Sequence, residues 1–230
     1  LNFKTKASNN PFLKKCPTAN DTNKVHFSIE KVNIFKNKNI KLHMLPYSLY
    51  EPLIFSYNTT DSIPRVFGDV HQIHFNTTPI HREYQLAIRA NIPKNIKAKT
   101  YIATTDMEGN FWYIGGTWED GFIKTKTREF GNFCIIADTI NPIIKGVNIY
   151  PGKIFTKQAT IKCTIEDTDS GIKSYRGEID GKWILLDYDY KRQLLKFDIE
   201  KNMSKGKHTF RLEVTDNVGN SNKYKAEFTL

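Results

Sequence analysis

The sequence predicts an all-β protein made of two tandem immunoglobulin-like β-sandwich domains. Apolar and polar residues alternate with a period of two along many short segments, and clusters of Asp, Asn and Gly separate these segments. No segment has a sustained helical stripe of apolar residues. The chain has 230 residues, of which 39% are hydrophobic and 13% aromatic. This length allows two cores, and the composition excludes a disordered chain.

The domain boundary is predicted where an apolar strand ends in a turn. The run Asn132–Asp138 is followed by Pro142, after which a new series of strands begins. We therefore expect a flexible polar lead-in over residues 1–19, a first sandwich over 20–138 and a second over 139–230.

In the first domain, β-favouring residues gather in short runs. The expected turn before the last of these runs is Glu108–Asn110, whose Gly and Asn suit a hairpin. The expected strands are Val25–Ile29, Leu53–Tyr57, Tyr84–Ile88, Tyr101–Thr105 and Phe111–Ile114.

The second domain has the more regular alternation. Turn residues at Glu166–Gly171, Asp180–Gly181 and Asp216–Asn220 separate its strands. Trp183 follows Cys163 at about the separation typical of the core Trp in immunoglobulin domains, which favours a buried Trp183. The inward positions are expected to be Ile161, Cys163, Ile165, Phe210, Leu212, Val214, Tyr224, Ala226 and Phe228.

The three cysteines do not form a complete disulfide framework, because their number is odd. Cys134 and Cys163 lie in strand-like segments and are expected to be small core residues. Two lysines before Cys16 argue against lipid attachment. The sequence has no apolar run of roughly 20 residues, so no transmembrane segment is expected. It also lacks a secretory signal and an initiator Met, so we expect an excised part of a longer protein.

The formal net charge is +10. Residues 1–139 carry a net charge of +6, and Lys4, Lys6, Lys14 and Lys15 in the lead-in contribute four of these positive charges; residues 140–230 carry +4. The basic residues are spread out and are not interleaved with aromatic residues. This pattern predicts weak attraction to polyanions and no nucleic-acid partner.

A series of short segments stands out by its order along the chain: Tyr47–Leu53, Pro79–His81, Ile114–Trp118, Thr127–Gly131, Ala137–Thr139, Asp169–Ile172, Tyr175–Gly177, Ile179–Trp183, Asp187–Asp189, Gly206–His208 and Thr215–Asn220. In this order the segments resemble the region downstream of the catalytic domain in bacterial zinc metallopeptidases of the lysostaphin type. The resemblance covers roughly residues 45–225 and implies a parent protein that cuts peptides in peptidoglycan, with this chain as its β-sandwich tail.

The catalytic motif of that family is absent from the sequence. The family binds zinc through a His-x-x-x-Asp pair and a His-x-His pair, and neither pattern occurs among the six histidines. A Gly-x-Ser-x-Gly elbow and a phosphate-binding glycine loop are also missing. We therefore expect no catalytic residue and no cofactor in this chain, with zinc only in the parent's catalytic domain.

The sequence offers two alternative metal sites. His71, His74 and His81 lie near Asp69, but a spacing of three places His71 and His74 on opposite faces of a strand, which favours surface or turn-bonding histidines. Asp167, Asp169 and Asp216 are potential calcium ligands. The short Asp-x-Asp-Ser-Gly pattern is more typical of a turn whose side chains cap backbone N–H groups.

A glycan site is a further alternative, centred on the predicted hairpin. Trp112, Tyr113 and Trp118 supply rings on which sugars stack, and Glu119 and Asp120 supply hydrogen-bond acceptors. Alternation places Trp112 and Tyr113 on opposite faces, so some of these rings are expected in the core.

The favoured hypothesis is a non-catalytic accessory region that targets or spaces a cell-envelope peptidase. The expected partners are peptidoglycan or another envelope glycan and the upstream catalytic domain, and the expected location is the bacterial periplasm or cell surface. An independent carbohydrate-binding module and a structural segment of a surface protein are the alternatives.

Overall fold

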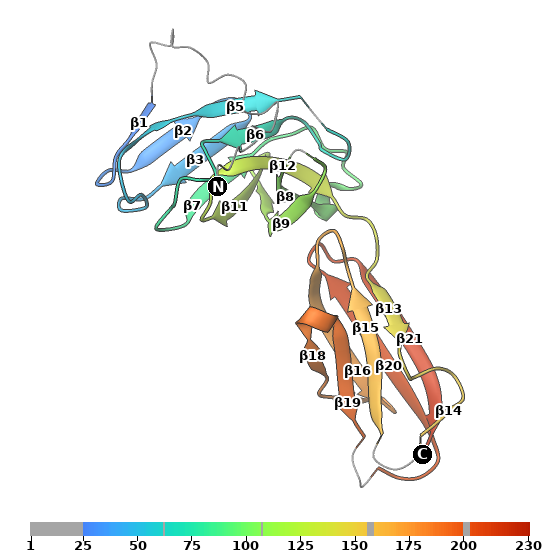
Figure 1. Cartoon of the computed structure of the whole chain (residues 1–230). Coiled ribbons are helices and arrows are strands. Elements are labelled where there is room, and N and C mark those ends of the chain that lie inside the picture. The colour runs from blue at the N-terminus through green and yellow to red at the C-terminus, as the bar shows by residue number, and fades with distance from the viewer. Residues whose placement is uncertain (1–24, 62, 107, 156–158, 200–202) are drawn as a thin grey trace, which may run out of the picture.

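The computed structural model describes residues 25–61, 63–106, 108–155, 159–199 and 203–230. The expected lead-in and Cys16 lie outside the described residues. The chain forms two successive all-β units (Figure 1), so the predicted all-β class and its β-sandwiches are confirmed.

The described residues of the first unit form twelve strands and a short 3-10 helix, η2 (Lys97–Lys99). Two five-stranded sheets, β10-β11-β7-β3-β2 and β5-β6-β12-β8-β9, pack face to face, and β1 and β4 form a separate pair. The strands are β1 (Val25–Phe27), β2 (Asn33–Lys36), β3 (Ile40–Met44), β4 (Leu53–Phe55), β5 (Tyr57–Thr60), β6 (Val70–Ile73), β7 (Tyr84–Ile88), β8 (Thr100–Thr105), β9 (Phe111–Gly115), β10 (Thr117–Glu119), β11 (Phe122–Thr127) and β12 (Gly131–Ala137).

One expected strand of this unit, Leu53–Tyr57, is divided at Ser56. Before Ser56 the chain pairs with β1, and after it the chain pairs with β6 in another sheet. Period-two alternation continues through such a change of partner, so it does not reveal where the change occurs. Asp106 accepts hydrogen bonds from the backbone of Glu108 and Asn110, which stabilises the turn predicted before β9.

The second unit has the sheet orders β13-β15-β19-β18 and β14-β21-β20-β16-β17, an arrangement like the two sheets of immunoglobulin domains. A 3-10 helix, η3 (Tyr190–Arg192), lies between β18 and β19. The strands are β13 (Ile143–Gly146), β14 (Lys153–Ile154), β15 (Thr160–Glu166), β16 (Ile172–Ile179), β17 (Lys182–Ile184), β18 (Asp187–Asp189), β19 (Leu194–Asp198), β20 (Lys207–Asp216) and β21 (Ser221–Thr229).

The expectation of a buried Trp183 is wrong. Trp183 lies on the edge strand β17 and is 56% exposed, because its neighbour Ile184 has the position that packs against the core. Leu186 fills the space beside Gly177, where an added Cβ would lie 2.6 Å from the Leu186 Cδ1 atom.

Both described cysteines lie in cores, as predicted. Cys134 and Cys163 are free thiols with no more than 1% of their surface exposed. Burial raises the pKa of each thiol to about 12. At neutral pH both are protonated and unreactive, which agrees with a structural role.

Candidate functional site

The five residues of the predicted glycan site do not share one surface environment. Trp112 on β9 is 54% exposed, whereas Trp118 on β10 packs against the apolar core of the first domain. Tyr113 lies on the other face of β9, with its ring 4.9 Å from that of the buried Tyr101. Trp112 is therefore the most accessible of the three rings for stacking on a sugar.

The indole N–H of Trp118 is already bonded within the protein. It donates to the Lys97 carbonyl oxygen at 3.1 Å and to Thr100 Oγ1 at 2.9 Å, and Lys97 Nζ lies 4.3 Å from the ring centroid. Glu119 and Asp120 both contact Lys124 Nζ, at 3.0 and 3.4 Å. These contacts connect β10 to β11 and to η2.

The three histidines considered as zinc ligands lie in separate environments. His71 is buried, with Nδ1 2.8 Å from the Tyr57 hydroxyl, and His74 is buried beside the ring of Phe130. His81 is exposed. Surface or turn-bonding histidines were expected here; His71 and His74 are not on the surface, and His74 Nδ1 accepts from the Ser56 backbone N–H. Burial lowers the pKa of both, which favours neutral imidazole.

The outer face of the sheet β10-β11-β7-β3-β2 carries a basic groove, defined by Lys36, Lys41, Lys124 and Lys126. The register aligns Lys36 with Lys41, and aligns both Lys41 and Lys124 with Ala87. Because Ala87 is small, the surrounding longer side chains enclose a shallow groove of about 660 Å³. This surface brings together basic residues from three separate strands.

Most of the charge in the groove is available to a partner. Among the described residues, no carboxylate forms an ion pair with Lys36, Lys41 or Lys126, whereas Lys124 pairs with Glu119. The Lys41 ammonium lies 4.1 Å from the centroid of the Phe122 ring. A second hollow of about 510 Å³, which shares His43, Gln85 and Lys126, extends the basic surface toward Arg82 and Arg128.

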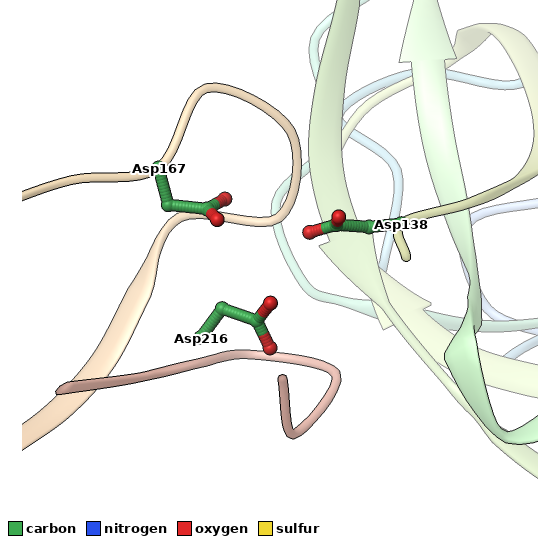
Figure 2. Close-up of side chains that lie close together, drawn as sticks. All are labelled: Asp138, Asp167 and Asp216. Carbon is green, nitrogen blue, oxygen red and sulfur yellow. The ribbon is translucent and has the colours of Figure 1, made fainter. Parts of the chain in front are cut away.

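Three carboxylates meet where the two domains join, and we call Asp138, Asp167 and Asp216 the acidic junction. One ligand oxygen from each lies within 4.8 Å of the others. Figure 2 shows Asp138 approaching from the end of the first domain, while Asp167 and Asp216 approach from two turns of the second. The residues of the acidic junction are therefore far apart in sequence but converge in space.

Hydrogen bonds from nearby hydroxyl, amide and backbone N–H groups hold each of the three carboxylates in place. Asp138 Oδ2 accepts from the Ser170 hydroxyl at 2.6 Å, and Asp167 Oδ1 accepts from the Gly171 N–H at 2.7 Å. Asp216 Oδ1 accepts from the Asn220 N–H at 2.8 Å, and Asp216 Oδ2 accepts from the Asn220 amide at 2.6 Å. Asp167 and Asp216 thus have the turn-capping role that the sequence favoured.

Further contacts cross between the domains near the acidic junction. Arg65 pairs with Asp169 at 2.7 Å, so Asp169 has a cationic partner of its own. Lys99 Nζ donates to the Val218 carbonyl oxygen at 3.2 Å, and the Asn220 side chain donates to the Asp138 carbonyl oxygen at 3.1 Å. These bonds connect the β15–β16 and β20–β21 turns to the first domain (Figure 1).

Neither the basic groove nor the acidic junction was predicted from the sequence. Asp167 and Asp216 were expected as potential calcium ligands, but Asp138 was not among them. The available signal was an Asp directly after a buried strand at a domain boundary. The basic groove left no local signal, because its lysines come together only through strand register.

Comparison with known proteins identifies the first domain. Residues 24–138, half of the chain, match the Zu5-like domain family. A search of curated proteins found no match. No helix among the described residues is long and apolar enough to cross a membrane.

Two solved structures have distant similarity to the chain. Fibronectin(III)-like modules of Clostridium thermocellum CbhA are 10% identical with a TM-score of 0.32, covering 65% of this chain and 85% of that chain. A chimeric titin Z1Z2-Z1Z2 tandem is 11% identical with a TM-score of 0.29, covering 64% and 90%. By the match to its first domain, the chain belongs to the Zu5-like domain family.

Proposed function

We propose that the chain is a non-catalytic accessory region of a cell-envelope protein, and that its first domain binds the carboxylate-rich polymer peptidoglycan. The observation that supports this most is the basic groove, where lysines from β2, β3 and β11 surround Ala87 without sufficient acidic partners. Exposed ammonium groups in a row attract a polyanion at low cost in desolvation.

The second domain acts in this proposal as a spacer. Hydrogen bonds at the acidic junction join its turns to the first domain, which favours a fixed relative orientation of the two sandwiches. A fixed spacer would hold the groove at a constant distance from whatever the chain is attached to. We place that assembly in the bacterial envelope.

The attached partner that we propose is the catalytic domain of a zinc peptidase. Only the ordered resemblance of the segments between Tyr47 and Asn220 supports this part of the proposal. Finding a His-x-x-x-Asp and a His-x-His pair upstream in the same gene would support it, and a gene without them would reject it.

Co-sedimentation with purified peptidoglycan at low and high salt tests polymer binding. We expect retention at low salt that falls at high salt, because added ions screen exposed charges. The double variant K41E/K126E should lose at least tenfold in affinity. The matched control K205E/K207E makes the same charge change on exposed lysines of the second domain and should retain binding; equal loss in both variants would contradict a specific groove.

An alternative function, sugar binding by the β9–β10 region, is favoured by the exposure of Trp112. The variant W112A should then abolish glycan retention without lowering the melting temperature. Substitution of Trp118 is a poorer test because its indole N–H bonds two groups of the protein. Retention of glycan by W112A would reject this alternative.

A further inference from the structure

The three carboxylates of the acidic junction have no positively charged partner in the part of the chain that the structure describes. Asp138 and Asp216 have 0% of their surface exposed, and Asp167 is half-buried. Arg65 lies across the same boundary and interacts electrostatically with Asp138, but its ion pair is with Asp169. Buried like charges at such short separations are unfavourable unless a cation or a proton compensates them.

A second feature independently points to a missing ligand. The hydroxyl of Tyr101 has no hydrogen-bond partner, although only 1% of the residue is exposed. Tyr101 packs in one cluster with Val218, which belongs to the turn that Asp216 caps. A buried hydroxyl normally has a partner, so an unpartnered one beside this turn calls for a further group.

The charges near the Tyr101 hydroxyl include members of the acidic junction. Burial raises the pKa of Tyr101 most, the carboxylates of Asp169, Asp138 and Asp167 raise it further, and the Arg65 guanidinium lowers it. The hydroxyl therefore lies near Asp138 and Asp167, yet it donates to none of these carboxylates.

We propose that the acidic junction binds one calcium ion, with Asp138, Asp167 and Asp216 as carboxylate ligands and the Tyr101 hydroxyl beside it. Calcium takes six to eight oxygen ligands at about 2.3–2.6 Å, so oxygens on opposite sides of one ion lie roughly 4.6–5.2 Å apart. The three carboxylate oxygens lie within 4.8 Å of one another, so they can share one such coordination sphere.

The hydrogen bonds already present are compatible with this role. Ligating carboxylates commonly accept hydrogen bonds that hold them in position for the metal. Asp167 Oδ1 is used by Ser170 and Gly171, which leaves Oδ2 without a partner among the described residues. A bound ion would connect the last residue of the first domain to two turns of the second, whether or not the first domain binds a polymer.

Titration of the chelator-treated protein with calcium chloride in a calorimeter tests the site. We expect one ion per chain and a rise in melting temperature, with an affinity near the roughly 10⁻⁴–10⁻³ M range of extracellular calcium modules. The variant Asp167→Asn should bind at least tenfold more weakly, since Asn retains the capping oxygen but loses the charge. The control Asp169→Asn, on the same loop, should stay within twofold of the wild type.

Two results would overturn the proposal. One is the absence of calcium binding to the wild type up to about 10 mM, well above that affinity range. The other is equal binding by the wild type and a folded Asp167→Asn. Tighter binding of magnesium chloride than of calcium chloride would reject the assignment to calcium.

Terbium luminescence supplies a test that does not depend on the folding of Asp167→Asn. Terbium often replaces calcium and is sensitised by a nearby tyrosine, so the wild type should luminesce and excess calcium should quench the signal. Tyr101→Phe keeps the ring and removes only an unpartnered hydroxyl; it should weaken terbium binding. Absence of tyrosine-sensitised emission from the wild type would contradict the proposal.

Discussion

The basic groove and the acidic junction each gather charges from several strands or turns, but the two sets differ in exposure. Lysines of the groove lie on an outer sheet face, and three of the four have no acidic partner among the described residues. Carboxylates of the junction are wholly or half buried and accept bonds from turn backbones. Exposed charges contribute little to folding and remain available to a partner, whereas buried ones are tied to the architecture.

The strongest test of this contrast is the loss of a buried carboxylate. Asp216→Ala should lower the free energy of unfolding by roughly 2–4 kcal/mol, because it leaves several buried donors unsatisfied. The change is measured by urea denaturation in the presence of a chelator, so that loss of a bound ion does not add to it. Asp187→Ala, on an exposed position of β18, is the control; equal effects of the two would remove the distinction between buried and exposed acids.

A second buried charge, His208, gives a smaller effect that depends on pH. Nδ1 of His208 lies 2.7 Å from Asp180 Oδ2 and Nε2 lies 2.8 Å from the Ser204 carbonyl oxygen. Two acceptors favour the doubly protonated ring, and the bond to Asp180 is the main cause of its raised pKa. The resulting stability is fully present below the unfolded pKa of roughly 6.5 and is lost as pH rises through the folded pKa.

We therefore expect the wild type to lose stability relative to His208→Phe between pH 6.5 and pH 9. His71 and His74 have lowered pKa values, so their contribution is present above the unfolded pKa and is lost only at more acidic pH. Urea denaturation at several pH values measures the difference, and parallel curves for the two proteins would contradict the assigned role of His208.

The ion pair between Arg65 and Asp169 should contribute less. The Arg65 side chain is 48% exposed, so solvent screens the pair and Arg65→Met should cost less than about 1 kcal/mol. Thermal denaturation of the full chain measures it. A larger loss of stability in Arg65→Met would mean that the Arg65–Asp169 pair, and not the acidic junction, contributes most to holding the two domains together.

The smallest effect on folding is expected in the basic groove. K41E/K126E should change the free energy of unfolding by no more than about 0.5 kcal/mol, since these side chains lie on the surface. Urea denaturation checks this, and an unchanged value means that lost polymer retention is not caused by unfolding. A large destabilisation would show that the lysines serve the first domain's own packing.

The sequence predicted the parts of this fold that depend on local pattern. Alternation located β7 from Tyr84 to Ile88, and the Asp and Gly residues of the Asp167–Gly171 turn indicated a capped loop. The division at Ser56 was not predictable, because it depends on which sheet each half joins. Trp183 was misplaced because a spacing borrowed from immunoglobulin domains does not specify which residue of an edge strand faces the core.

Predicting the basic groove and the acidic junction required non-local information. Lys41 and Lys124 are far apart in sequence and meet through their shared pairing with β7. Asp138 reaches Asp167 and Asp216 only because the second domain turns its loops toward the end of β12. The composition signalled an excess of positive charge but gave no indication of where it gathers.

The most direct test of the proposed division of roles is a nitrogen–proton NMR titration of the full chain with soluble peptidoglycan fragments. We expect backbone amide shifts in β2, β3, β7 and β11, which form the basic groove, with little change in the turns around Asp167 and Asp216. Shifts confined to the β9–β10 region or to those turns, or no shifts at all at low salt, would contradict polymer binding by the groove.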